Sequence, residues 1–208
     1  MFENVTLLLV LTVLATTAMA VSAAIQAARN DFDLFGAAFL AVITAVGGGT
    51  MRDLLIGNQP VFWLQDQIYV FTAVPVGMVA FFLAEKLEAG LGRRKLLLNL
   101  TDAVGLALFT LIGMRIALTA GISPVMAVFL GCITGIGGGI LRDIICGETP
   151  LVLKTDIYAT LSLAGGGLYL LLRGTMEEQM SLLIAFLFIL LVRVWLVFRP
   201  MNMGKKKP

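Results

Sequence analysis

The chain alternates long apolar runs with short polar connections along its 208 residues. A helix that spans a bilayer needs about 20 consecutive, mainly apolar residues. Runs of that length recur seven times, which predicts an all-α membrane protein with seven transmembrane helices. The expected helices lie at about 5–28, 35–57, 67–86, 96–118, 123–147, 154–173 and 180–199.

Composition supports the membrane interpretation and excludes several kinds of site. Apolar residues make up 59% of the chain and charged residues 13%, and the mean hydropathy is +0.98, far from the values of an ordinary soluble domain. The chain contains no histidine, which excludes histidine metal sites and Ser-His-Asp triads. No nucleotide-binding loop is visible, so we expect no enzyme, no catalytic residue, no cofactor and no bound metal beyond a permeating cation.

Charge near the segment ends predicts the orientation in the membrane. The first run begins with Glu3 and no Lys or Arg, which favours a retained helix over a cleaved signal peptide. Basic residues gather at the ends that share a side with the C-terminus, so the positive-inside rule places the C-terminus in the cytoplasm and the N-terminus outside. We interpret them as topology signals, not as a nucleic-acid patch. They are Arg29, Lys86, Arg93, Arg94, Lys95, Arg199, Lys205, Lys206 and Lys207.

An internal repeat appears when the chain is aligned with itself at an offset of 90 residues. GGGTMRDLLIGNQP at 47–60 then aligns with GGGILRDIICGETP at 137–150. Each copy holds three expected spans, an odd number, so the second copy must enter the membrane from the opposite side. Inverted repeats of this kind commonly enclose a permeation or binding site near the bilayer midplane. We therefore expect a first repeat at 1–90, a second at 91–175, and a seventh helix with a basic tail at 176–208.

Three consecutive glycines lie in the middle of the second and fifth expected spans. Each glycine destabilises a helix interior by about 1 kcal/mol relative to alanine, so six of them require a reason. One interpretation is close helix packing through small residues. We favour the other, a break or kink in each helix whose freed carbonyls and amides face a polar path. The expected break residues are Gly47, Gly48, Gly49, Gly137, Gly138 and Gly139.

An arginine and an aspartate follow each glycine run: Arg52 with Asp53, and Arg142 with Asp143. An unpaired charge at the centre of a membrane helix is unfavourable by at least ~2.5–3.5 kcal/mol, so we expect these residues to pair inside the bundle. A cross-repeat arrangement, Arg52 with Asp143 and Arg142 with Asp53, would suit a pseudo-twofold axis. The alternative is a set of structural salt bridges that never touch an ion.

Further polar residues fall inside the expected spans. We expect Asp102 to face the interior and to be functional. Thr44 and Thr134 precede the glycines by about one turn, so their hydroxyls either line the path or bond their own backbone carbonyls.

Arginine and aromatic residues near the span ends predict contacts with the membrane interface. Arg115 and Arg193 are expected to extend their side chains towards it. Trp63, Trp195, Tyr69 and Tyr158 are expected to anchor there.

With paired GGG-x-x-R-D motifs in the second and fifth of seven helices, the chain resembles the prokaryotic trimeric intracellular cation (TRIC) channels over nearly its whole length. The resemblance implies a homotrimer in a prokaryotic inner membrane, with a pore in each protomer for potassium and other monovalent cations such as sodium. It implies kinks at the six glycines, and motif ions at Arg52, Asp53, Arg142 and Asp143. The Lys-Glu-Val motif of the animal members is absent; Gly113, Met114 and Arg115 occupy that part of the fourth helix.

Three functions fit these patterns. The first is a passive channel for monovalent cations, with modest selectivity because the chain has no Thr-Val-Gly-Tyr-Gly filter. The second is a secondary transporter of a small zwitterion such as glycine, because related bacterial sequences are also labelled glycine transporters and half-helix ends suit such a substrate. The third, a membrane scaffold, explains packing glycines but not buried charges.

Overall fold

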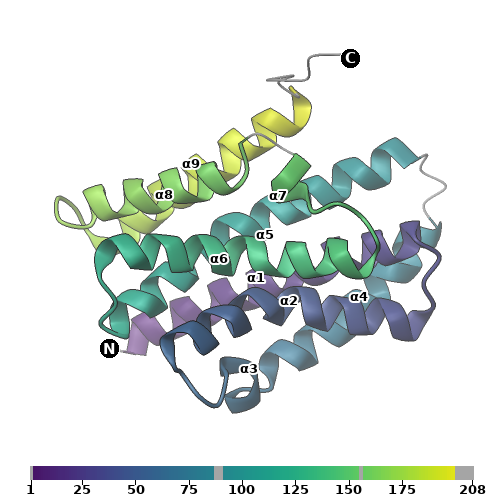
Figure 1. The fold of residues 1–208 in the computed structure, drawn as a ribbon, viewed down its shortest axis with the longest axis horizontal. Coiled ribbons are helices and arrows are strands. Elements are labelled where there is room, and N and C mark those ends of the chain that lie inside the picture. Colours follow the sequence, from purple (N-terminus) through teal and green to yellow (C-terminus); the bar gives the residue numbers. More distant parts are fainter. Residues whose placement is uncertain (1, 87–90, 155–156, 200–208) are drawn as a thin grey trace.

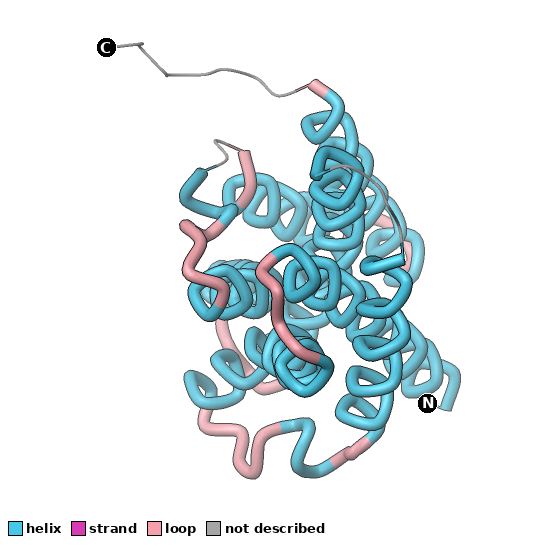
Figure 2. Tube along the Cα trace, turned by 90° about the vertical axis from the view of Figure 1, so that its right-hand side faces the viewer, coloured by secondary structure: helices cyan, strands magenta, loops and turns pink. Residues whose placement is uncertain are grey.

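The computed structural model describes residues 2–86, 91–154 and 157–199, and within them every regular element is a helix (Figures 1 and 2). The helices are α1 (Phe2–Arg29), α2 (Leu34–Ile56), α3 (Phe62–Gln65), α4 (Ile68–Lys86), α5 (Leu91–Thr119), α6 (Pro124–Ile145), α7 (Leu151–Lys154), α8 (Ala159–Leu172) and α9 (Glu178–Phe198).

Six of these helices, α1, α2, α4, α5, α6 and α9, are long and apolar enough to cross a membrane. The expected all-α membrane class is therefore confirmed, but the expected span at 154–173 is shorter than predicted. Its helix α8 has 14 residues, or about 21 Å at 1.5 Å per residue, against a hydrocarbon core of about 30 Å. The short helix α7 ends at Lys154, which confines the apolar helix to the residues after Tyr158.

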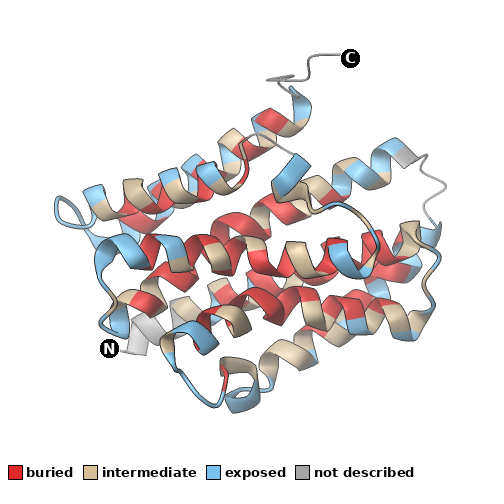
Figure 3. Ribbon diagram, in the orientation of Figure 1, coloured by how far each residue is buried: buried red, intermediate tan, exposed pale blue. Residues whose placement is uncertain are grey.

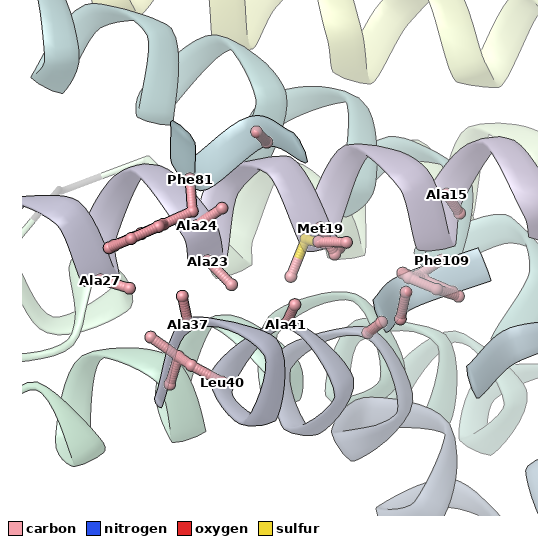
Figure 4. Close-up of a cluster of buried hydrophobic side chains, with 14 of the residues drawn as sticks. Ala15, Met19, Ala23, Ala24, Ala27, Ala37, Leu40, Ala41, Phe81 and Phe109 are labelled. Atoms are coloured by element: carbon pink, nitrogen blue, oxygen red, sulfur yellow. The ribbon is translucent and has the colours of Figure 1, made fainter. Parts of the chain in front are cut away.

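Helix α1 lies at the centre of one half of the bundle, where it packs against α2, α4 and α5. Its inward face is formed largely by alanines, and Figure 4 shows Ala23 and Ala24 close to side chains of α2 and α4. Small side chains let helices approach closely in a bilayer, where packing drives association. Met19 and Phe109 fill the remaining space of this core.

The outer faces of the bundle are apolar and exposed. Figure 3 shows buried residues concentrated on the mutually facing sides of α1, α2, α5 and α6. Large side chains such as Phe35 on α2 and Phe71 on α4 are more than 70% exposed. An apolar exterior around an interior that includes buried arginines and aspartates is the distribution expected in lipid.

The two motif helices end in the same way. Gly57 closes α2 with a φ of 73°, and Gly147, 90 residues later, has a φ of 66° just beyond α6. This left-handed conformation suits glycine and commonly terminates helices. The repeat in the sequence therefore corresponds to a repeated local structure.

The expected helix breaks are absent. Helix α2 continues from Leu34 to Ile56 and α6 from Pro124 to Ile145, each passing through its three glycines. The prediction that Gly47–Gly49 and Gly137–Gly139 interrupt their helices was therefore wrong. The physical reason is that the glycines serve a close contact between the two helices, described next.

Candidate functional site

Helices α2 and α6 touch at their glycines. A Cβ atom on Gly48 would overlap the carbonyl oxygen of Thr134, and one on Gly138 would overlap the carbonyl oxygen of Thr44. The two contacts are reciprocal: the residue four positions before each glycine meets the other glycine, so the helices pass in opposite directions. Any side chain at Gly48 or Gly138 would push the backbones apart, so the alternative interpretation, close packing, holds here.

The neighbouring glycines differ between the two halves. A Cβ on Gly49 would lie 2.5 Å from the Phe62 ring, so an aromatic side chain fills that space. A Cβ on Gly139 would lie 3.4 Å from Asp102 Oδ1 and 3.7 Å from both Arg142 Nη2 and the Tyr158 hydroxyl. The second half therefore has a polar niche where the first half has an aromatic ring.

In the first half, Arg52 pairs with its own neighbour in the sequence. Arg52 Nε donates to Asp53 Oδ1 at 2.9 Å, and Nη2 lies 2.8 Å from the same oxygen. The other oxygen, Asp53 Oδ2, accepts from the backbone N–H of Phe62 at 2.8 Å, at the start of α3. The guanidinium also lies over the Phe62 ring, 5.4 Å from its centroid.

The second half repeats this arrangement. Arg142 Nε donates to Asp143 Oδ1 at 2.9 Å, and Asp143 Oδ2 accepts from the N–H of Leu151 at 2.8 Å, at the start of α7. Each motif aspartate thus binds the arginine before it and the short helix that follows.

The expected cross-repeat pairs, Arg52 with Asp143 and Arg142 with Asp53, are therefore not formed. Each carboxylate is held at the turn of its own half by the backbone of the following short helix. The preceding arginine is long enough to fold back onto it.

Arg142 makes further contacts that Arg52 lacks. Its Nη1 donates to Asp102 Oδ1 on α5 at 2.8 Å and to the hydroxyl of Ser22 on α1. The Tyr158 hydroxyl donates to the other oxygen of Asp102. As expected, Asp102 faces the interior, where it is fully buried.

Helix α9 also reaches this group. Arg193 on α9 is 2% exposed, and its guanidinium carbon lies 4.4 Å from the centroid of the Tyr158 ring. The expectations that Arg193 extends to the interface and that Tyr158 anchors there were therefore wrong, because the guanidinium stacks on the Tyr158 ring inside the bundle, although Arg193 Nε has no hydrogen-bond partner among the described residues. We call Asp102, Asp143, Arg142, Arg193 and Tyr158 the second-half ionic cluster; its two carboxylates balance its two guanidiniums.

The motif threonines differ as well. Thr134 Oγ1 donates to the Leu130 carbonyl at 2.6 Å, the backbone-bonding alternative. The buried Thr44 Oγ1 and Arg142 Nη2 have no hydrogen-bond partner within the described part of the chain. Buried polar atoms without partners are rare, and they are candidates for contact with water or a transported species.

A cavity of about 600 Å³ opens at one end of the bundle. It lies between the ends of α2 and α5, where Gly57, Asn58, Arg115 and Thr119 contribute to its lining. Arg115 Nε also lies 3.1 Å from Glu178 Oε1, which links α5 to α9. The cavity can hold water and places a cationic side chain at its wall.

Tyr158→Phe is expected to destabilise the protein by about 1–3 kcal/mol, because the change removes one donor from the buried Asp102 carboxylate. The matched control is Tyr169→Phe, since the Tyr169 hydroxyl makes a 3.3 Å contact with the partly exposed Glu178. Thermal unfolding of both variants in detergent measures the difference. Equal melting temperatures would contradict the importance assigned to the Tyr158–Asp102 bond.

Comparison with known proteins gives concordant results. Residues 9–85 and 99–174 match the family model described as "Glycine transporter". The chain is similar to the Escherichia coli inner membrane protein YadS, at 41% identity over 75% of this chain and 74% of that protein.

Two solved structures superpose closely. A TRIC trimeric intracellular cation channel orthologue from Rhodobacter sphaeroides has a TM-score of 0.88 at 34% identity, covering 94% of this chain and 100% of that one. A prokaryotic TRIC channel in 0.5 M KCl has a TM-score of 0.88 at 30% identity, covering 95% of this chain and 99% of that one.

Proposed function

The chain belongs to the TRIC channel family, a multi-pass membrane family, and from that membership we propose that it is a passive channel for monovalent cations. The observation that carries the proposal is the superposition of almost the whole chain on two TRIC structures with a TM-score of 0.88. The function proposed is transport across the membrane and not catalysis.

The polar groups in the interior of the bundle fit a role in ion passage better than a purely structural role. Buried charges are unfavourable in a membrane and are concentrated at functional sites. Here two carboxylates lie among the buried residues of the second half, and Thr44 Oγ1 and Arg142 Nη2 are left without partners. A scaffold role would explain the glycine contact but not these groups.

We place the route beside the crossing of α2 and α6, and not between those helices. Their backbones touch at Gly48 and Gly138, which leaves no passage there. Gly139 leaves space next to Asp102 and Arg142. The 600 Å³ cavity lies at the ends of α2 and α5, and its lining includes neither of these two residues, so in the proposed route it is a separate part at the end of the bundle. An oxygen from a hydroxyl or a carboxylate is a suitable ligand for a dehydrating cation.

The proposal also includes an inverted repeat, an orientation in the membrane and an oligomeric assembly. The opposite directions of α2 and α6 and their reciprocal contacts support two inverted three-helix repeats followed by α9. The basic ends at Arg29, Lys86 and Arg94 support a cytoplasmic C-terminus; the basic tail at 205–207 lies outside the described residues. The assembly proposed is a homotrimer with one pore in each protomer, as the family name of the matched channels implies.

The proposed permeant ions are potassium and, with modest discrimination, sodium. Purified protein in liposomes loaded with potassium salt is expected to release K⁺ down its gradient, at a rate that does not saturate with gradient size as a carrier would. Protein-free liposomes are the control for leak.

The same liposomes test the second candidate, a glycine transporter, which the description of the matched family model favours. Labelled glycine is added outside under the same gradient. Saturable glycine uptake without K⁺ release would overturn the channel proposal in favour of the transporter.

A further inference from the structure

A second cavity, unrelated to the ionic cluster, lies on the side of the bundle formed by α1, α4 and α5. Its volume is about 500 Å³, within the range of sites that hold small molecules. The groove is lined by Val21, Ile25, Pro75, Val76, Val79, Ala80, Leu83, Ala84, Arg94, Leu97 and Thr101.

The wall of this groove offers almost no free polar group. Thr101 is a polar residue in it, and its hydroxyl donates to the carbonyls of Leu97 and Leu98 at 3.0 and 3.1 Å. Pro75 carries no backbone N–H, and the other lining residues of α1 and α4 have apolar side chains. Such a surface suits a hydrocarbon chain and gives a polar solute nothing to bind.

One end of the groove is basic. Arg94 lines it and reaches the backbone carbonyls of Ala28 and Glu85 through contacts of 3.5 Å, which is long for a hydrogen bond. Leu97 and Thr101 follow Arg94 along α5 by about one and two turns, so the wall changes from cationic to apolar along the helix. In the sequence, residues 85–95 carry four basic side chains and two acidic ones, a net positive charge: Lys86, Arg93, Arg94 and Lys95 against Glu85 and Glu88. Of these, Glu88 lies outside the described residues.

From this combination we infer that the groove binds an anionic phospholipid. An acyl chain occupies the apolar wall, and the phosphate lies at the Arg94 guanidinium, a geometry that arginine favours for phosphate. Charge complementarity selects an anionic headgroup over a zwitterionic one, because cationic residues next to a membrane attract anionic lipids. The inference stands whether the protein is a channel or a transporter.

The test is native mass spectrometry of the full-length, delipidated protein after addition of phosphatidylglycerol or phosphatidylcholine. The wild type is expected to retain phosphatidylglycerol in preference to phosphatidylcholine. Arg94→Gln is expected to lose that preference, whereas Arg94→Lys keeps most of it. The matched control is Arg93→Gln, which removes an exposed charge next in the sequence that does not line the groove.

A second pair of variants tests the acyl-chain site. Val79→Trp fills the groove and is expected to reduce retention of both lipids. Val79 is 59% exposed, so the larger side chain displaces no buried residue. Val125→Trp makes the same change at a 64% exposed position on α6, outside the groove, and is expected to have no effect.

Three results would overturn the inference. The first is an equal loss of preference in Arg93→Gln and Arg94→Gln, which would indicate a diffuse basic belt. The second is unchanged lipid retention in Val79→Trp. The third is a change of oligomer mass in Val79→Trp with lipid retention intact, which would make a second copy of the chain the occupant.

Discussion

Gly48→Ala and Gly138→Ala are each expected to destabilise the protein by about 3 kcal/mol, at the upper end of overpacking effects. The added methyl group would overlap a backbone carbonyl oxygen of the facing helix, Thr134 for Gly48 and Thr44 for Gly138. A backbone atom in a helix cannot rotate away as a flexible side chain can. The two helices must therefore separate, which disturbs packing on both sides of the crossing.

The control for this prediction is Gly167→Ala on α8, where a Cβ would meet nothing within 4 Å. Helix propensity alone favours alanine there, so this variant is expected to be as stable as the wild type or slightly more stable. Thermal unfolding in detergent and the yield of monodisperse protein are the measurements. If Gly48→Ala behaved like Gly167→Ala, the close contact of α2 and α6 would be refuted.

Arg142→Met is expected to destabilise the protein by about 3–5 kcal/mol, the range for breaking a buried ion pair. The substitution removes the hydrogen bonds from Nε to Asp143 and from Nη1 to Asp102, and so leaves two buried carboxylates without this partner. Arg52→Met is the matched control. This change removes the arginine partner of one carboxylate, Asp53, which keeps its hydrogen bond from the Phe62 N–H. The expected loss of stability is therefore smaller.

The double variant Arg142→Met with Asp102→Asn separates charge from packing. Because it neutralises one of the two stranded carboxylates, it is expected to recover part of the stability that Arg142→Met loses. Chemical denaturation of the wild type, Arg142→Met, Arg52→Met and the double variant in the same detergent measures their free energies of unfolding. Equal effects of Arg142→Met and Arg52→Met would contradict the asymmetry between the halves.

The sequence predicted the membrane class and the long helices, because apolar runs are local signals. The inverted repeat stays a prediction. Asp102 was also predicted correctly to face the interior, since a carboxylate inside an apolar span has few alternatives. The role of Gly48 and Gly138 was not predicted correctly. A helix break and a tight helix crossing both call for glycine, and only the position of the facing helix distinguishes them.

The pairing of the motif arginines and aspartates was also predicted incorrectly, because it depends on residues that lie outside the motif. The fold brings Tyr158 and Arg193 to Asp102 and Arg142 from helices outside the motif. The repeat could not reveal them, since the residue 90 positions before Tyr158 is Ile68. Each arginine pairs with its neighbouring aspartate because the short helix that follows holds that aspartate in place. This tertiary contact cannot be inferred from the symmetry of the repeat.

Single-channel recording tests the central claim, passive cation conduction, most directly. Purified protein is incorporated into a planar bilayer between potassium salt solutions of unequal concentration. We expect discrete unitary currents that reverse near the potassium equilibrium potential and persist without glycine. A silent bilayer, with the same preparation catalysing saturable glycine uptake into liposomes, would contradict that claim.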